Sequence, residues 1–203
     1  VALRVISESA SKRIAKYAFE TATQRDSMKK VTCVHKSNVM RVTDGLFAKA
    51  CTDVSKDYPD IAFEEMYVDA CAMNLIRQPE QFDVVVTTNL FGDILSDESS
   101  QVVGGLGMAP AANIGDNFAL FEPVHGAAFD IAGQNIANPS SFLLSIKLML
   151  DWLGAKHNDS KCFEVGAKLE SVIFDLVKSG VKTKDIGGDA TTIEFTRHIT
   201  DNL

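Results

Sequence analysis

The chain has 203 residues, of which 46% are apolar and 23% are charged, and its formal net charge is −7. This composition supports a packed core and excludes extensive disorder, and the excess of acidic residues argues against nucleic acid or an anionic membrane as the main partner. No apolar run has the length of a membrane span and no secretion leader is visible, so we expect a cytoplasmic protein. The four widely spaced cysteines are expected to be buried, reduced thiols.

Helical and strand-like segments alternate through the first half of the chain, which is typical of an α/β fold. In chain order, the patterns predict a helix at 7–24, a strand at 31–35, a helix with Thr43 as its N-cap, a strand at 63–68, a helix at 69–77, a strand at 83–88 and a helix at 91–103. The unbroken apolar run of the strand at 83–88 indicates burial on both of its faces.

The composition changes at the glycine-rich stretch 104–107, which we interpret as the boundary between two regions, 1–103 and 104–203. These glycines do not form the Gly-x-Gly-x-x-Gly pattern after a strand, so a Rossmann fingerprint is absent. Beyond them, the sequence predicts a loop at 108–117, a strand at 118–121, mostly irregular structure at 122–138, and helices near 140–153, 161–178 and 190–202.

Two acidic residues, Asp93 and Asp97, are four positions apart on a predicted helix, so both carboxylates project from one face. A cation between them would relieve their repulsion, and hard oxygen ligands suit Mg²⁺ or Mn²⁺. The alternative is that both residues lie in the first turns of the helix, where acidic side chains interact favourably with the helix dipole.

Two further candidates lie where predicted strands end. Asp69 follows a strand and opens a helix, so it is either an N-cap or a third metal ligand. Lys36 ends a strand beside apolar residues, where desolvation would lower its pKa and make it a possible general base. The alternative for Lys36 is an ordinary surface lysine.

The segment 122–138 is too apolar for a solvated linker, and its many glycine and alanine residues would let a ligand approach the backbone closely. Within it, Asp130 could accept hydrogen bonds from a ribose diol and would repel a 2′-phosphate. His125 has no metal-binding partner at a useful spacing, so zinc is not expected there.

Taken together, these segments resemble the isocitrate/3-isopropylmalate dehydrogenase family, and the text around 119–133 looks closest to archaeal-type members of its isopropylmalate branch. The resemblance covers nearly the whole chain in order. Its motifs include VHKSNVM at 34–40, MYVDA at 66–70, TNLFGDILSDE at 88–98, GGLGMAP at 104–110, FEPVHG at 121–126 and DIGGDATT at 185–192.

The resemblance implies an α/β, isopropylmalate dehydrogenase-like two-domain fold that is not a Rossmann fold and is incomplete in this chain. Region 1–103 would form most of the smaller, dimer-forming domain, and region 104–203 the C-terminal part of the cofactor-binding domain. Family members carry a preceding segment with a substrate-binding arginine cluster and a catalytic tyrosine. We therefore expect the 203 residues to be the C-terminal part of such an enzyme, with little or no activity alone.

The implied reaction is an NAD-dependent, Mg²⁺- or Mn²⁺-dependent oxidative decarboxylation of a 2-hydroxy acid with a β-carboxylate. We expect 3-isopropylmalate, an intermediate of leucine biosynthesis, to be the substrate; isocitrate or homoisocitrate is the alternative. An alternative of another class is a non-catalytic regulatory or dimerisation subunit. Because such relatives typically lose metal carboxylates, the retained aspartates and Lys36 favour a catalytic chain.

By resemblance, Lys36 and Asp69 are the catalytic residues, and Lys36 is the base that takes the hydroxyl proton. Asp69, Asp93 and Asp97 are the implied metal ligands. In the family, the lysine and the first aspartate reach into the partner subunit's site, which implies a homodimer with shared active sites. Asn38 would lie near nicotinamide and substrate, and Asp130-Ile131 matches the NAD-type version of the adenosine loop. The implied cofactor-binding residues are Asn38, Glu122, His125, Gly126, Ala127, Ala128, Asp130, Ile131 and Asn138.

Overall fold

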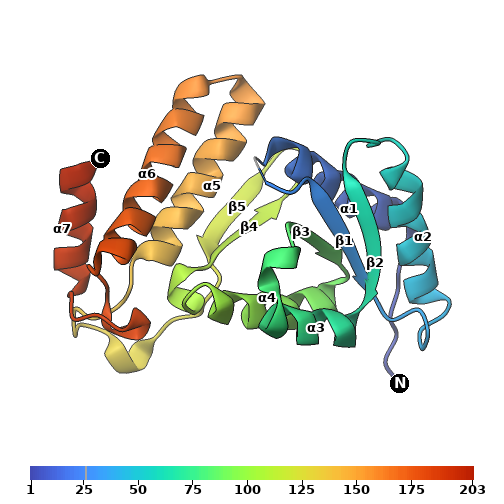
Figure 1. The fold of residues 1–203 in the computed structure, drawn as a ribbon, viewed down its shortest axis with the longest axis horizontal. Coiled ribbons are helices and arrows are strands. Elements are labelled where there is room, and N and C mark those ends of the chain that lie inside the picture. Colours follow the sequence, from blue (N-terminus) through green and yellow to red (C-terminus); the bar gives the residue numbers. More distant parts are fainter. Residues whose placement is uncertain (26) are drawn as a thin grey trace. The chain divides into compact units, whose positions relative to one another are not determined.

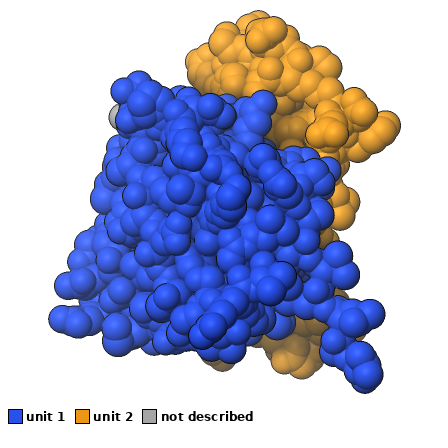
Figure 2. Space-filling view, turned by 90° about the vertical axis from the view of Figure 1, so that its right-hand side faces the viewer, with its two compact units in different colours: residues 1–102 blue, residues 103–203 orange. Residues whose placement is uncertain are grey.

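The computed structural model describes residues 1–25 and 27–203, which divide into two compact units (Figures 1 and 2). Unit 1 comprises Val1–Val102 and unit 2 comprises Val103–Leu203, so the division falls just before Gly104. Each unit has a hydrophobic core of its own. No helix in the described part of the chain is long and apolar enough to cross a membrane.

Unit 1 is built on a parallel three-stranded sheet in the order β2–β1–β3 (Figure 1). Its strands are β1 (Lys30–His35), β2 (Ala62–Tyr67) and β3 (Val84–Thr87). Its helices are α1 (Glu8–Gln24), α2 (Thr43–Ser55), α3 (Val68–Arg77) and α4 (Asn89–Val102), with a 3₁₀ turn at Pro79–Gln81. Because the strands are parallel, their carboxyl ends meet at one edge of the sheet, where Lys36, Val68 and Thr88 follow.

Helices cover both faces of this sheet, since side chains alternate between the faces along each strand. On one face, α1 and α2 contribute Phe19 and Phe47 to a core that includes Cys33. On the other face, α3 and α4 contribute Leu75 and Leu95, which pack with Val34 of the same strand. The central strand β1 is consequently buried along nearly all of its length.

Unit 2 pairs an antiparallel hairpin with three helices (Figure 1). The strands are β4 (Pro110–Ile114) and β5 (Ala119–Pro123), and the helices are α5 (Ser140–His157), α6 (Ser160–Ser179) and α7 (Thr192–Asn202). Short 3₁₀ turns occupy Leu106–Met108, Phe129–Ile131 and Lys184–Ile186. The helices form the core, in which Leu144, Ile173 and Phe195 are buried. The hairpin packs against α5.

Several sequence expectations need correction. The loop expected at 108–117 contains β4, whose alanine- and asparagine-rich text has low strand propensity and which forms by pairing with β5 from Pro110 to Ile114. The strand at 83–88 packs on both faces as expected, with Val84 and Val86 in the core of α1 and α2 and Val85 against the core of α3 and α4, but Val84 and Val85 are only half-buried. Thr43 is not an N-cap: α2 begins at Thr43, and Val42 precedes it without a side-chain cap.

The expectation that the cysteines are buried, reduced thiols is confirmed for three of the four. All four thiols are free, and Cys33, Cys51 and Cys71 are buried, whereas Cys162 is half-buried. Burial raises the pKa of the Cys71 thiol to about 11, so this thiol stays protonated and unreactive at neutral pH.

Candidate functional site

The parallel register of β1 and β2 brings Lys36 and Asp69 together. His35 is paired with Tyr67 at the carboxyl ends of the two strands, so the residues that follow emerge side by side. The Lys36 amine donates a hydrogen bond to Asp69 Oδ1, and this ion pair joins residues that are 33 positions apart in the sequence. The Lys36 ammonium also lies 5.5 Å from the centre of the Tyr67 ring. The lysine side chain is half-buried, so it is not an ordinary, freely solvated surface lysine.

Asp69 does not occupy the N-cap position that its sequence context suggested. Tyr67 is the N-cap of α3 and Asp69 is the second helical residue. The Lys36 ammonium, followed by the backbone N–H groups of Asp69 and Ala70, holds the pKa of the Asp69 carboxyl below its ordinary value. The carboxyl group is therefore ionised at neutral pH and available as an oxygen ligand.

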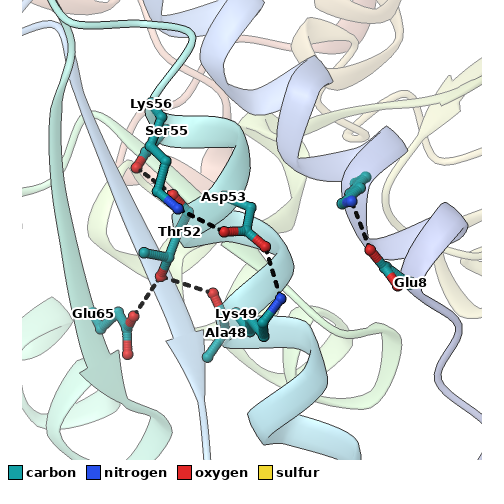
Figure 3. Close-up of polar contacts among 9 residues, drawn as sticks. Glu8, Ala48, Lys49, Thr52, Asp53, Ser55, Lys56 and Glu65 are labelled. Carbon is teal, nitrogen blue, oxygen red and sulfur yellow. Dashed lines mark hydrogen bonds and ion pairs between the residues drawn. The ribbon is translucent and has the colours of Figure 1, made fainter.

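Behind Lys36 lies a polar group that the sequence reading missed. His35 is buried, its Nε2 lies 3.1 Å from Glu65 Oε2, and its Nδ1 accepts the Ser37 N–H at 3.2 Å. The Thr52 hydroxyl donates to Glu65 Oε1 at 2.8 Å, as Figure 3 shows. With Met66 and Tyr67, the residues His35, Ser37 and Glu65 line a cavity of about 200 Å³. The signal was the position of His35 at a buried strand end, one residue before the lysine.

Asp93 and Asp97 are exposed on the outer side of α4. The helix begins at Asn89, so neither residue lies in its first turn, and the interpretation as dipole-stabilising acids is wrong. Among the described residues, no lysine, arginine or histidine forms an ion pair with either carboxylate. Two uncompensated carboxylates one helical turn apart fit a hard divalent cation.

One copy of the chain does not bring the three expected metal ligands together. In residues 1–25 and 27–203, no group of three His, Cys, Asp or Glu side chains lies close enough to hold a metal ion, so Asp69 does not join Asp93 and Asp97. Asn38 lies in the turn after β1 and is exposed at the same sheet edge as Lys36.

In unit 2, the expected adenosine loop is mostly exposed. The residues from His125 to Asp130 are all exposed, and Ile131 is half-buried. Glu122 lies earlier, on β5, where its Oε1 accepts a hydrogen bond from Asn113 at 3.0 Å. Gly126, Ala127 and Ala128 give this loop a run of small side chains, followed by the exposed Phe129 and the exposed Asp130 carboxylate. A carboxylate acceptor among small residues fits the ribose and base of an adenosine group.

Asn138 fixes the end of this loop. Its amide donates to Asp185 Oδ2 at 3.0 Å, and its Oδ1 accepts the Ser140 N–H at 2.9 Å at the start of α5. Gly107 closes the cluster, because a Cβ there would lie 2.6 Å from Asp185 Oδ2 and 3.1 Å from the Asn138 side chain. Asp185 is thus a supporting residue that the sequence reading quoted only as part of a motif.

The comparisons with known proteins agree with this geometry. The sequence model of the isocitrate/isopropylmalate dehydrogenase family matches residues 1–203. The chain is 52% identical over 204 residues to 3-isopropylmalate dehydrogenase of Sulfurisphaera tokodaii, and the alignment covers 100% of this chain and 59% of that protein. It is 51% identical over 193 residues to homoisocitrate dehydrogenase of Methanocaldococcus jannaschii, with coverage of 95% and 53%.

The fold matches a solved structure over its full length. The crystal structure of isocitrate dehydrogenase from Methylococcus capsulatus aligns with a TM-score of 0.89 at 39% identity, covering 100% of this chain and 58% of that one. The expected isopropylmalate dehydrogenase-like α/β fold is therefore confirmed. The chain spans less than two thirds of the length of the curated relatives it matches. By sequence and by fold, the chain belongs to the isocitrate/isopropylmalate dehydrogenase family.

Proposed function

We propose that the protein containing this chain oxidises a 2-hydroxy acid with a β-carboxylate, using NAD and Mg²⁺ or Mn²⁺, and releases CO₂. The observation that carries the proposal is the Lys36–Asp69 pair at the carboxyl edge of the unit 1 sheet. A basic amine and an ionised carboxylate at one sheet edge are the groups needed to move a proton beside a metal-bound substrate. The relatives' names support the reaction class.

Lys36 is the proposed general base. Its Nζ would accept the proton of the substrate's 2-hydroxyl group as hydride passes from the same carbon to NAD. The ammonium that pairs with Asp69 must first lose a proton to solvent, because a protonated lysine has no free lone pair. Asp69 keeps the amine at the strand edge before substrate arrives. A metal held by the aspartates would supply Lewis acidity to the substrate.

Asp69, Asp93 and Asp97 are the proposed metal carboxylates. Since Asp69 does not join the other two within the described part of one chain, a three-carboxylate site needs a second copy. This separation supports a homodimer in which Lys36 and Asp69 of one subunit complete the site that Asp93 and Asp97 of the other begin.

Unit 2 is the proposed adenosine-binding region. Asp130 would accept hydrogen bonds from the ribose hydroxyls and disfavour a 2′-phosphate, which selects NAD over NADP. Asn138 would lie near the adenine, and Glu122, His125, Gly126, Ala127, Ala128 and Ile131 are the other proposed cofactor-binding residues of this unit. In unit 1, Asn38 is the proposed contact near nicotinamide and substrate.

The substrate we favour is 3-isopropylmalate, which places the protein in leucine biosynthesis in the cytoplasm. Homoisocitrate is the second candidate, because a relative of that name is 51% identical to the chain. A regulatory or dimerisation subunit without activity is less well supported, since Lys36 and all three aspartates are retained.

The test is turnover of the full-length protein on 3-isopropylmalate, isocitrate and homoisocitrate, each with NAD or NADP and with or without Mg²⁺. We expect metal-dependent NADH formation and CO₂ release, fastest on 3-isopropylmalate. Activity on isocitrate alone would contradict 3-isopropylmalate as the substrate. Faster reduction of NADP than of NAD would contradict the proposed role of Asp130. Inactivity on all three acids would favour the non-catalytic alternative.

A further inference from the structure

A buried carboxylate lies directly under the proposed base. Asp44, the second residue of α2, has a fully buried side chain. Its Oδ1 lies 2.9 Å from a guanidinium nitrogen of Arg4, and its Oδ2 accepts the backbone N–H of Lys36 at 2.7 Å. A buried charge persists only when it is paired and hydrogen-bonded, so Arg4 is what allows Asp44 to hold Lys36 by its backbone.

The same arginine reaches the segment that carries the metal carboxylates. Another guanidinium nitrogen of Arg4 donates to the Thr88 hydroxyl at 2.7 Å, and the guanidinium lies 5.1 Å from the centre of the Phe91 ring. Thr88 connects β3 to α4, and Phe91 lies in the first turn of α4. One planar group therefore links the turn that begins at Lys36 to the start of the helix that bears Asp93 and Asp97.

We propose that Arg4 and Asp44 are positioning residues for the proposed base, an inference that rests on the proposed function of Lys36. The Asp44 side chain is fully buried and the Arg4 guanidinium is held by Asp44 and Thr88, so both act through the Lys36 backbone and the start of α4. Without Arg4, the buried Asp44 carboxylate lacks its counter-ion and the turn after β1 loses its anchor. Lysine cannot replace the arginine fully, because a single ammonium does not present the planar fork that serves Asp44 and Thr88 at once.

The chain contains a matched control at the opposite end of β1. Arg25 Nε lies 2.8 Å from Asp83 Oδ1, and Asp83 Oδ2 accepts the Lys30 N–H at 3.3 Å. The Asp83 side chain is fully buried, like that of Asp44. Both arginine–aspartate pairs therefore hold one backbone N–H beside the same strand, but the Arg25 pair has no candidate catalytic residue next to it.

The experiment compares Arg4→Met, Arg4→Lys and Arg25→Met in the full-length protein. The measurements are kcat, the KM values for hydroxy acid and NAD, and the thermal midpoint. In addition, the pH dependence of Lys36 acetylation by acetic anhydride is followed by peptide mass spectrometry. For Arg4→Met we expect kcat to fall about 10- to 100-fold, with little change in the KM for NAD. Losses of this size are typical when a residue that orients a functional side chain is removed. We also expect the Lys36 acetylation profile of Arg4→Met to shift. Arg25→Met should lower the thermal midpoint without either effect, and Arg4→Lys should lie between wild type and Arg4→Met.

Equal losses of kcat in Arg4→Met and Arg25→Met at similar thermal midpoints would overturn the proposal, and so would an unchanged acetylation profile in Arg4→Met. If Arg4→Met does not fold, the comparison of Arg4→Lys with Arg25→Met decides on the same criteria. Acetylation does not depend on turnover. A wild-type protein without dehydrogenase activity would therefore refute the proposed function, while the acetylation profiles still decide whether Arg4 positions Lys36.

Discussion

In unit 1 the candidate catalytic residues follow the ends of hydrogen-bonded strands, whereas in unit 2 the candidate cofactor residues lie on an exposed loop. Lys36 and Asp69 are fixed by the register of β1 and β2 and by the buried Asp44. Asp130 lies in the open loop, which is held near its end by Asn138 and Asp185. In the proposed function, proton transfer therefore takes place at a sheet edge fixed by strand pairing, where small displacements cost rate, and the cofactor meets an exposed loop that is held mainly at its end.

The strongest test of the sheet edge is Lys36→Met. Loss of a general base typically reduces the rate by about 10²- to 10⁴-fold, so we expect kcat of the full-length protein to fall within that range. Lys30→Met is the matched control, because Lys30 lies at the other end of β1, is 21% exposed against 22% for Lys36, and pairs with Glu64 at 2.9 Å. An equal loss in both variants would mean that Lys36 matters only for folding.

The next largest effect is expected for Asp93→Asn. The substitution keeps the size of the side chain but removes its charge. Loss of a residue that only orients a metal ligand lowers metal affinity about 10- to 100-fold, so loss of a ligand's charge should lower Mn²⁺ affinity by at least that factor. Titration of the full-length protein followed by electron paramagnetic resonance measures this affinity. Asp175→Asn, an exposed acid on α6, should bind Mn²⁺ like wild type. Unchanged affinity in Asp93→Asn would remove this residue from the metal site.

Gly107→Ala tests the attachment of the loop in unit 2. The new methyl group would lie 2.6 Å from Asp185 Oδ2, so we expect a loss of about 1–3 kcal/mol in unfolding free energy and a higher KM for NAD, with kcat less affected. Gly45→Ala in α2 meets no atom within 4 Å and should stabilise the protein by about 0.5–1 kcal/mol. Chemical denaturation and initial rates measure both variants. A KM for NAD that stays at the wild-type value would show that the contacts around Gly107 do not affect cofactor binding.

The smallest effect is expected at a surface ion-pair group on α2 (Figure 3). Hydrogen bonds from Lys56 and Lys49 lower the pKa of Asp53 to about 2. A lowered carboxyl pKa stabilises the folded state above the ordinary carboxyl pKa, and this contribution disappears as the pH falls toward 2. Asp53→Asn should therefore be slightly less stable than wild type at pH 7, and high salt should shrink the difference. Denaturation curves with and without salt measure it, and a salt-independent difference would contradict an electrostatic origin.

The sequence predicts most of the helices and strands of unit 1, because their apolar periodicity agrees with the packing that the fold requires. It does not predict β4, which depends on pairing with β5 rather than on its own residues. Sequence position suggests Lys36 and Asp69 separately, but only the register between β1 and β2 makes them neighbours.

Other parts of the site depend on contacts between distant segments. Arg4 and Thr88 are 84 positions apart, so no local pattern reveals their hydrogen bond. Asp44 reads as an ordinary acidic residue at a helix start, and its complete burial follows from the packing of α2 near the end of β1. Supporting residues are harder to predict than reacting ones because their partners are tertiary.

The contact of Asp44 with the Lys36 backbone also determines which connections of unit 1 can change length. Because Asp44 spans the turn between β1 and α2, an inserted residue at 37–43 would separate its carboxylate from the Lys36 N–H. The connection at 56–61 lies at the opposite edge of the sheet and holds neither Lys36 nor Asp69. Insertions that vary this domain, in evolution or in the laboratory, should therefore accumulate at 56–61 and be rare at 37–43.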